Sequence, residues 1–465
     1  MRNDSDKNVL LLHAPAGKYA FGRKWIKNNI LSPPLGLLYL GSPLLREGYN
    51  VSYVDLNVDH FKKAEFMDLL KESNFILITC FNYTIHNVEK IIKDIKRVNE
   101  KAFILCGGHY FNTFKEYVEG SYLTCIGEAE GYITKILDSI ILKKSLNGIP
   151  GLIYKKDGQV VENPGIMKVD DLDSSLPPAW ELINRKKYGF IGNARVDVAM
   201  IMSSRGCPYN CHYCAFTGDK RYRTRSVNNV VNEIKSLIRQ GYKYISFCDD
   251  NFLANKRRVH KIMDKIIQEK IKVKILVQAR VDSADYELYK KLRDAGTILM
   301  AFGLESGNQD VLDYYNKRTT VEKAVEAINL ANKVGLVTFG HFMIGAPFET
   351  EKHFNKNKEF IDSIPLDLMT CYILWYQKGS KLWEEAIKKG IIKASELSVL
   401  ADRRLSNYSS KELAKIKYDF LYHFYMNPRR WLKLLYKVIR LGEARLIVKA
   451  VLNTKLIFNL LGFSD

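Results

Sequence analysis

The chain has 465 residues, 47% of them hydrophobic and 26% charged, as is typical of a globular protein with a full core. This length favours two or three domains over one. No apolar stretch reaches the roughly 20 residues of a membrane span, and the polar, charged N-terminus is unlike a secretory signal peptide. We therefore expect a cytoplasmic protein.

The formal net charge of +20 is unevenly distributed. Residues 403–455 hold 13 Lys and Arg against three Asp and Glu, so half of the net charge lies in this C-terminal stretch. The chain contains no known nucleic-acid-binding motif, and a basic balance alone does not indicate one. Nucleic acid is therefore not an expected partner.

Residues 1–148 alternate between short apolar runs and helical segments. This alternation predicts an α/β fold of the Rossmann-like kind, with a parallel sheet and helices on both faces. Ligands of such sheets bind at the carboxyl ends of the strands. The runs that predict strands are 9–13, 51–55, 75–80, 102–106 and 122–126, with helices expected at 35–47 and 87–99.

A connector is expected over residues 149–195, where Lys156-Asp157-Gly158 predicts a hairpin turn. Residues 196–380 repeat the strand–helix alternation six times, which predicts a partial (βα)6 barrel of the TIM type with its site at the carboxyl ends of the strands. Residues 381–465 are expected to form a helical, basic C-terminal region. The barrel strands are expected at 198–203, 244–249, 273–278, 298–304, 338–344 and 368–376.

Three of the eight cysteines lie within eight residues, in the loop after the first barrel strand. Cys207, Cys211 and Cys214 have the spacing C-x3-C-x2-C, which suits thiolates that wrap one iron–sulfur cluster. Three thiolates leave one iron of a [4Fe–4S] cluster open for a substrate. A closed zinc site would need a fourth ligand, which His212 could supply only from inside the loop. The other five cysteines stand apart in apolar runs, as buried inert thiols do.

The motif C-x3-C-x-aromatic-C, with Tyr213 as the aromatic residue, resembles the signature of the radical S-adenosylmethionine (SAM) superfamily. Segments 248–251, 303–307 and 340–349 lie where that superfamily carries its SAM-binding motifs. The resemblance implies that one electron from the cluster cleaves SAM to a 5′-deoxyadenosyl radical, which removes hydrogen from an unactivated C–H bond. The residues expected to bind SAM are Tyr213, Asp249, Asp250, Arg280, Glu305, Ser306 and Gly345.

Structural alternatives stay open for several of these residues. Asp249 and Asp250 can cap the following helix. Gly345 can permit a tight turn, and Tyr213 can serve local packing. Glu305 ends an apolar strand, where an unpaired carboxylate is costly, and this favours a ligand role.

The N-terminal region resembles the cobalamin-binding domain of the cobalamin-dependent radical SAM subgroup. The resemblance rests on the run 33–40 and on the glycine-containing segments 107–108 and 127–130. The chain lacks the D-x-H-x-x-G motif that supplies an axial histidine in methionine-synthase-type domains, and His109 directly follows the glycine pair where the subgroup has Gly-Gly-x-His. The alternative is a domain that keeps the fold without the cofactor. The residues expected near cobalamin are Asn82, Tyr83, Thr84, Gly107, Gly108, Gly127 and Glu128.

The resemblance to a radical SAM barrel that follows a cobalamin-binding domain implies a radical SAM methyltransferase. Its substrate would be carbon or phosphorus of a small-molecule, lipid or peptide natural product. A flavodoxin or ferredoxin would be its electron donor. Relatives that close rings or oxidise substrates without methyl transfer are the alternative. An RNA methylthiotransferase would need a second cluster in the N-terminal domain, but Cys80, Cys106 and Cys125 are spread over three expected strands.

The segment after Pro428 predicts a helix with Lys433, Lys437 and Arg440 on one face. The plainer interpretation is a helix that packs its apolar side on the barrel and keeps a solvated basic face. A basic amphipathic helix can also lie on an anionic membrane surface, which would make the protein peripheral to the membrane. An acidic protein partner is a third interpretation.

Overall fold

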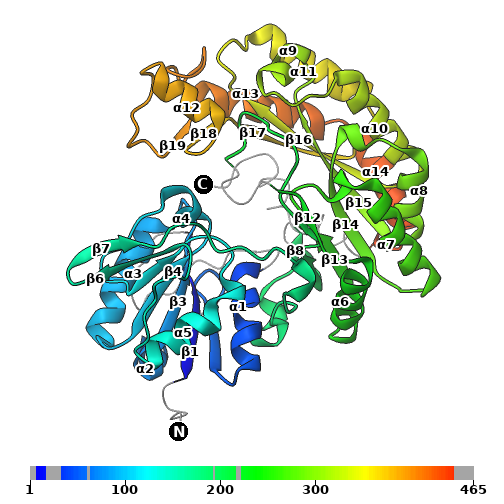
Figure 1. Ribbon diagram of the computed structural model, residues 1–465. Coiled ribbons are helices and arrows are strands. Elements are labelled where there is room, and N and C mark those ends of the chain that lie inside the picture. The colour runs from blue at the N-terminus through cyan, green and yellow to red at the C-terminus, as the bar shows by residue number, and fades with distance from the viewer. Residues whose placement is uncertain (1–6, 17–32, 60–62, 192–193, 216–220, 445–465) are drawn as a thin grey trace. The chain divides into compact units, whose positions relative to one another are not determined.

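The computed structural model describes residues 7–16, 33–59, 63–191, 194–215 and 221–444 (Figure 1). The chain divides into two compact units. The first comprises residues 1–189 with 217–219, and the second comprises residues 190–216 with 220–465. Each unit is built on a main sheet of its own.

The sheet of the first unit has seven strands, β1 to β7. The strands are β1 (Asn8–His13), β2 (Asn50–Asp55), β3 (Phe75–Thr79), β4 (Phe103–Gly107), β5 (Leu123–Cys125), β6 (Leu152–Lys156) and β7 (Gln159–Glu162). Their order is β2-β1-β3-β4-β5-β6-β7. Strands β1 to β5 are parallel, whereas β6 and β7 form an antiparallel hairpin beside β5. The hairpin that the sequence placed in a connector therefore extends this sheet.

Helices cover both faces of the first sheet. They are α1 (Leu35–Arg46), α2 (Lys63–Glu72), α3 (Ile85–Val98), α4 (His109–Phe114) and α5 (Ile133–Ile141). Neighbouring residues of a strand point to opposite faces, so Leu10 and Leu12 pack with α2 and α3, whereas Val9 and Leu11 pack with α1 and α5. This two-sided burial explains why the strands read as continuous apolar runs.

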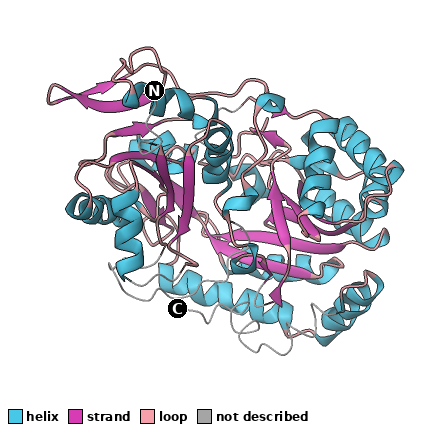
Figure 2. Cartoon of the chain, turned by 90° about the horizontal axis from the view of Figure 1, so that it is seen from below, coloured by secondary structure: helices cyan, strands magenta, loops and turns pink. Residues whose placement is uncertain are grey.

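The main sheet of the second unit has six parallel strands whose order follows the chain. They are β10 (Val198–Ile201), β13 (Tyr244–Phe247), β14 (Lys274–Arg280), β15 (Thr297–Glu305), β16 (Val337–Ile344) and β17 (Leu368–Ile373). The helices between them are α6 (Val227–Arg239), α7 (Lys256–Gln268), α8 (Tyr286–Asp294), α9 (Gln309–Tyr314), α10 (Val321–Lys333) and α11 (Glu351–Ser363). The figures show these helices along the outside of the strands, which is the expected partial barrel (Figures 1 and 2).

Capping side chains fix where several barrel helices begin, and so fix the loops that precede them. Ser226 accepts a hydrogen bond from the backbone of Asn229, and Asn255 accepts one from Arg258. Asp285 caps α8 in the same way. Because a cap residue has extended rather than helical backbone angles, each helix starts after a polar loop at the carboxyl end of a strand. Polar side chains therefore gather at one end of the barrel.

Short strands and three helices complete the second unit. They are β8 (Phe190–Ile191), β9 (Ala194–Arg195), β11 (Ser204–Arg205), β12 (Arg223–Thr224), β18 (Trp375–Gln377), β19 (Ser398–Leu400), α12 (Lys381–Lys388), α13 (Ser410–Tyr425) and α14 (Pro428–Arg440). The Tyr425 hydroxyl at the end of α13 donates to the carbonyl of Met369 at 2.6 Å, which ties this helix to β17. Within the described ranges, no helix has both the length and the apolar character that crossing a membrane requires.

The solvated basic face expected for α14 is present only in part, because Lys433 and Arg440 are exposed whereas Lys437 is not. The Lys437 ammonium lies 2.6 Å from the buried carboxylate of Asp367, so this lysine faces the barrel. The exposed side also carries an apolar stripe of Leu432, Tyr436 and Ile439, which are 66%, 61% and 55% exposed. A buried carboxylate needs a counter-ion, and this accounts for the inward position of Lys437. Residues 445–465 of the expected helical tail lie outside the described residues.

Candidate functional site

The loop with the three closely spaced cysteines begins after β11 and precedes β12, and these two short strands pair with each other. Cys207 and Cys211 are half-buried and Cys214 is exposed, and none of the three forms a disulfide. The backbone N–H of Gly206 donates to Asp250 Oδ2 at 2.8 Å, which ties the start of the loop to the end of β13. The backbone N–H of His212 donates to the carbonyl of Tyr315 at 2.9 Å. The loop is therefore anchored on both sides of Cys211.

The three thiols of the loop are not arranged as the ligands of a single metal ion. In the part of the chain that the structure describes, no three His, Cys, Asp or Glu side chains converge as the ligands of one metal ion would. Thiolates of a [4Fe–4S] cluster bind different irons and need not converge. The His212 ring nitrogens face the Tyr314 carbonyl at 3.1 Å and the Lys381 ammonium at 3.3 Å, so this imidazole is occupied elsewhere.

One cation lies beside the cysteine loop. The guanidinium of Arg280 is 3.5 Å from Cys211 Sγ and stacks on the Tyr209 ring at 3.6 Å from its centroid. Arg280 also donates to Asp282 at 3.1 Å, and the Tyr209 hydroxyl donates to the same carboxylate at 2.6 Å. A thiolate-bound cluster is negatively charged, so three closely spaced thiols with a fixed guanidinium beside Cys211 fit this cofactor.

A cavity of about 490 Å³ opens at the carboxyl ends of the barrel strands, next to the cysteine loop. Four residues expected to bind SAM line it, and these are Tyr213, Asp250, Arg280 and Glu305. Three further lining residues, Asn251, His341 and Met343, belong to segments in which the sequence predicted SAM-binding motifs. The sequence did not single out Gln278, Lys317, Tyr372 and Trp375, which also line the cavity. These four residues are spread over 97 positions from Gln278 to Trp375, so no contiguous motif could have revealed them.

Glu305 is not an unpaired carboxylate but half of a buried ion pair. The Lys317 ammonium lies 2.5 Å from Glu305 Oε1, and the Tyr213 hydroxyl donates to the same oxygen at 3.0 Å. Burial raises the pKa of Tyr213, which stays a phenol that can donate. Glu305 has a left-handed backbone with φ of 62°, at an irregularity in the pairing of β15 with β16. Strain of this kind is typical of functional positions.

The structure places Asp249 away from the cavity, unlike its neighbour Asp250. Its carboxylate is only 2% exposed and accepts hydrogen bonds from the backbone of Ser203 at 2.7 Å and from the Ser203 and Ser204 hydroxyls at 2.5 Å. Successive residues point to opposite sides of extended chain, so only one of the two aspartates can face the cavity. Asp249 thus ties β13 to the segment that leads into the cysteine loop.

Ser306 and Gly345 also lie outside the lining of this cavity. The Ser306 hydroxyl is buried and donates to Asn357 Oδ1 at 3.1 Å. Gly345 has a φ of 110°, and its N–H donates to the buried Glu349 carboxylate at 2.6 Å. A Cβ at Gly345 would lie 3.0 Å from that of Ala401. Both residues therefore shape the turns behind the cavity.

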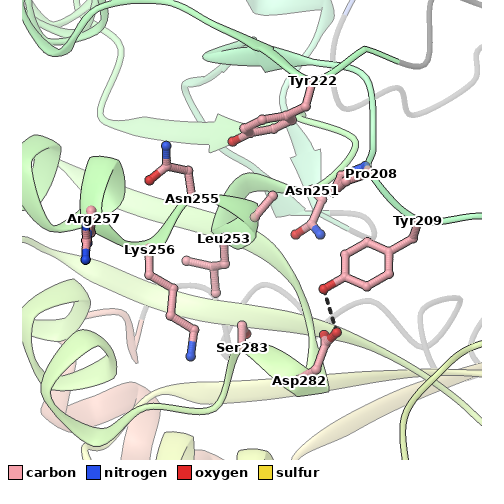
Figure 3. A pocket seen from close by; sticks show the side chains of 11 residues that line it. Pro208, Tyr209, Tyr222, Asn251, Leu253, Asn255, Lys256, Arg257, Asp282 and Ser283 are labelled. Carbon is pink, nitrogen blue, oxygen red and sulfur yellow. Dashed lines mark hydrogen bonds between the residues drawn. The ribbon is translucent and has the colours of Figure 1, made fainter.

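A second cavity of about 550 Å³ lies beside the cysteine loop, between Tyr209 and the start of α7 (Figure 3). Figure 3 shows Lys256 and Arg257 at its border, with the hydrogen bond from Tyr209 to Asp282 on the opposite side. Asn251 lines both this cavity and the first one. The wall of this cavity combines polar side chains with the apolar residues Pro208, Leu253 and Ala254.

In the first unit a cavity of about 110 Å³ lies between the carboxyl half of the sheet and helices α1 and α5. A Cβ at Gly108, whose φ is 109°, would lie 2.8 Å from the carbonyl of Cys80. Gly127 has a φ of 101° and no room for a side chain next to Met167. At both positions a side chain would collide with neighbouring backbone, so only glycine allows the chain to pack this closely at the edge of the cavity. Of the residues expected near cobalamin, those that line the cavity are Gly107, Gly108 and Gly127.

The remaining residues expected near cobalamin differ in their surroundings. Asn82 Oδ1 is buried without a hydrogen-bond partner among the described residues, so it is available to a ligand. Tyr83 is 60% exposed, and Thr84 is buried and accepts from the backbone of Phe81 at 2.9 Å. Glu128 accepts from the backbone of Val169 at 2.8 Å and does not line the cavity. An orphaned amide oxygen beside a glycine-rich cradle fits a large polar cofactor.

A second iron–sulfur cluster in the first unit does not fit its cysteines. Cys80 and Cys106 belong to the core on one face of the sheet, whereas Cys125 belongs to the core on the other. Burial raises the pKa of Cys80 and of Cys125 to about 12, so these thiols stay protonated and inert. Three thiols on two faces of a sheet cannot bind one cluster.

Comparison with known proteins finds a matching family model in each of the two units. Residues 201–361 match the Radical SAM superfamily, and residues 30–137 match the B12 binding domain. The chain is a radical SAM protein with a B12-binding domain. These two domains imply a [4Fe–4S] cluster, SAM and cobalamin as cofactors, and the protein is a radical SAM enzyme.

Relatives of this B12-binding radical SAM protein carry methyltransferase and cyclase names. It is 28% identical over 415 residues to an uncharacterised methyltransferase of Pyrococcus horikoshii, a match that covers 86% of this chain and 89% of the relative. It is 27% identical over 340 residues to the anaerobic magnesium-protoporphyrin IX monomethyl ester cyclase of Cereibacter sphaeroides, with coverage of 69% and 55%. The chain thus spans about half of the cyclase.

A solved structure shows the same fold. The radical SAM methyltransferase TsrM of Kitasatospora setae, with cobalamin and a [4Fe–4S] cluster bound, superposes with a TM-score of 0.67 at 19% identity. The match covers 82% of this chain and 75% of TsrM. The expected fold, with a cobalamin-binding-type domain followed by a partial barrel, is confirmed.

Proposed function

We propose that this enzyme transfers a methyl group to an unactivated carbon, or to phosphorus, of a small-molecule, lipid or peptide substrate. When bound, the cluster and SAM supply a 5′-deoxyadenosyl radical and cobalamin supplies a transferable methyl group. The proposal rests on one observation, which is that a three-cysteine loop beside an open barrel cavity occurs in the same chain as a glycine-lined cavity in a B12-binding domain. The methyltransferase name of the P. horikoshii relative supports it.

Cys207, Cys211 and Cys214 would bind the cluster and leave one iron open for the methionine end of SAM. That end of SAM carries an ammonium and a carboxylate, and the cavity offers partners for both. Asp250 and Glu305 can accept hydrogen bonds from the ammonium, while Arg280 and Lys317 can donate to the carboxylate. Buried side chains that are already held by neighbours bind with little loss of entropy.

The far wall of the cavity is aromatic and suits a substrate with a flat or apolar part. The His341 and Tyr372 rings stack at 6.2 Å, and Tyr372 and Trp375 are 55% and 46% exposed. Burial lowers the pKa of His341, so this imidazole is neutral at pH 7 and its ring can pack against an apolar group. A neutral wall keeps water away from a reactive radical.

The experiment is anaerobic reconstitution with iron, sulfide and hydroxocobalamin, followed by reductant and methyl-labelled SAM. We expect 5′-deoxyadenosine together with retained corrin absorbance, and labelled product once the substrate is supplied. Cys207→Ala should abolish nucleoside release, whereas Cys371→Ala, the same change at a buried thiol outside the loop and outside the expected SAM-binding segments, should keep it. Nucleoside release with an unlabelled, cyclised product would favour the cyclase alternative.

An acidic one-electron donor of the flavodoxin or ferredoxin kind would reduce the cluster from the side of Cys214. Cys214 is exposed, and the nearby cavity carries Lys256 and Arg257 at the start of α7 (Figure 3). Charge complementarity of this kind raises the association rate at low salt. The double variant Lys256→Glu/Arg257→Glu should slow flavodoxin-driven turnover more than tenfold while dithionite-driven turnover stays unchanged. Equal loss with both reductants would contradict this partner site.

The exposed apolar stripe of α14 is suited to an anionic membrane surface. Leu432, Tyr436 and Ile439 lie on one side of the helix and are flanked by the exposed cations Lys433 and Arg440. In flotation with phosphatidylglycerol vesicles, the wild type should float and Leu432→Glu/Ile439→Glu should remain at the bottom. Val160→Glu, at an exposed apolar side chain of β7, is the matched control and should float. Equal recovery of wild type and double variant would exclude the membrane contact.

A further inference from the structure

The guanidinium of Arg280, at the end of β14, is held on three sides by groups other than a cysteine. Nε donates to Asp282 Oδ1 at 3.1 Å, and Nη2 donates to the backbone carbonyl of Lys317. The central carbon of the guanidinium lies 3.6 Å from the centroid of the Tyr209 ring. The residue is only 8% exposed. The position of this cation is therefore set by the barrel and by one aromatic ring.

Tyr209 connects the cation to the cysteine loop. It lies within the loop, two residues after Cys207 and two residues before Cys211. Its hydroxyl donates to Asp282 Oδ2 at 2.6 Å, at the border of the second cavity (Figure 3). Asp282 thus accepts hydrogen bonds from both the cation and the phenol, and this keeps the guanidinium stacked on the face of the ring.

The remaining side of the guanidinium faces a cysteine of the loop. Nη1 of Arg280 donates to Cys211 Sγ at 3.5 Å. A guanidinium has five N–H donors, and the contacts to Asp282, Lys317 and Cys211 use three of them, so donors remain for the carboxylate of SAM. Arginine stays charged throughout the accessible pH range. Cys211 Sγ therefore has a permanent positive charge and a hydrogen-bond donor beside it, and neither depends on the thiol for its position.

We propose that Arg280 raises the reduction potential of the [4Fe–4S] cluster through its contact with Cys211 Sγ, and that Tyr209 is its positioning residue. In the reduction, the cluster gains one electron, the donor loses one, and no bond or proton moves. The reduced cluster carries one more negative charge than the oxidised cluster. A neighbouring cation and a hydrogen bond to a ligating sulfur stabilise the more negative state, and they thereby raise the potential.

The test is a redox titration of the reconstituted cluster without SAM, in which electron paramagnetic resonance follows the reduced cluster. Iron and sulfide are measured first, so that only proteins with a complete cluster are compared. Arg280→Gln should lower the ratio of reduced to oxidised cluster at a fixed potential by roughly tenfold, which for one electron corresponds to about 59 mV. An unchanged midpoint potential in Arg280→Gln with a complete cluster overturns the proposal.

Variants of Tyr209 test its positioning role. Tyr209→Leu keeps an apolar side chain under the guanidinium but has no aromatic face, so it should lower the potential by less than Arg280→Gln does. Tyr209→Phe keeps the face and should stay near the wild-type potential. A wild-type potential in Tyr209→Leu would exclude the positioning role. Should Arg280→Gln fail to assemble a cluster, Arg280→Lys decides. A lysine lacks the planar fork, so the potential should again fall, and a wild-type potential there would overturn the proposal.

Arg318→Gln is the matched control for the loss of one positive charge near the loop. Arg318 is exposed and donates to Asn316 Oδ1 at 3.4 Å, and the Asn316 amide donates to the carbonyl of Asn210 in the cysteine loop at 2.8 Å. We expect a much smaller shift than in Arg280→Gln. Equal shifts would mean that the total charge, and not the contact with Cys211, sets the potential. Neither cobalamin nor a methyl acceptor is present in this titration, so its outcome is independent of the methyl transfer proposed above.

Discussion

The ammonium of Lys317 lies 2.5 Å from Glu305 Oε1 at the mouth of the barrel, and both side chains are at least nine-tenths buried. Such a pair is costly to bury but far costlier to break, because the remaining charge has no counter-ion. The Tyr213 hydroxyl donates to the same oxygen and links the pair to the cysteine loop. We therefore predict that SAM binding and the stability of the barrel depend on the same contact.

Lys317→Met should lower the free energy of unfolding by about 3–5 kcal/mol, since it leaves the Glu305 carboxylate buried and unpaired. The double variant Lys317→Met/Glu305→Gln should recover most of this loss, because both charges are then absent. Urea unfolding of Lys317→Met, of Glu305→Gln and of the double variant measures the coupling energy between the two side chains. Losses that simply add would show that the two side chains do not interact. Lys317→Met and the double variant should both bind SAM weakly, which equilibrium dialysis can check.

Gly108→Ala should destabilise the first unit by about 1–3 kcal/mol, since φ is 109° and the new Cβ would meet the Cys80 carbonyl at 2.8 Å. Gly148→Ala is the matched control, because its φ is also positive at 78° but nothing lies within 4 Å. The control should lose about 1 kcal/mol or less. Thermal unfolding gives the comparison. Equal losses would mean that the backbone angle matters and the close approach does not.

The free energy of unfolding of the barrel should fall as the pH rises, because Glu349 loses its proton. Burial raises its pKa to about 7, so the folded protein binds a proton that the unfolded chain releases near its ordinary pKa. The stability that this carboxyl contributes is therefore full below about pH 4 and falls as the pH approaches 7, by a total on the order of 3 kcal/mol. Glu349→Gln should flatten the dependence, because an amide does not titrate and still accepts from Gly345. Urea unfolding at pH 5 and 7.5 measures this, and an unchanged slope in the variant would contradict it.

Asp249→Ala should cost about 2–4 kcal/mol, because it leaves buried donors of Ser203 and Ser204 without an acceptor. We also expect it to lower the iron content after reconstitution, since these serines precede the cysteine loop. Asp250→Ala, at the exposed neighbouring position, should cost roughly 1 kcal/mol or less and act mainly on SAM binding. Iron analysis and guanidinium unfolding together distinguish the effects of the two substitutions. If Asp250→Ala proved the more destabilising change, the assignment of the two aspartates would have to be exchanged.

The cluster loop could be predicted from the sequence, because its three thiols lie close together in the chain and their spacing can be read directly from Cys207 to Cys214. It also determined the alternation of strands and helices, since buried parallel strands need continuous apolar runs and helices need an apolar stripe. The order of the two domains followed from these local patterns.

Which distant side chains meet depends on the tertiary fold. Asp249 and Asp250 are equivalent in sequence, and the alternation of the backbone turned one toward the cavity and the other into a hydrogen-bonded core. Lys317, His13 and Lys437 stand alone in the sequence, yet each faces a buried carboxylate. Their partners lie 12 to 70 residues away and are brought close by strand register and helix packing, for which no contiguous stretch of sequence carries a signal.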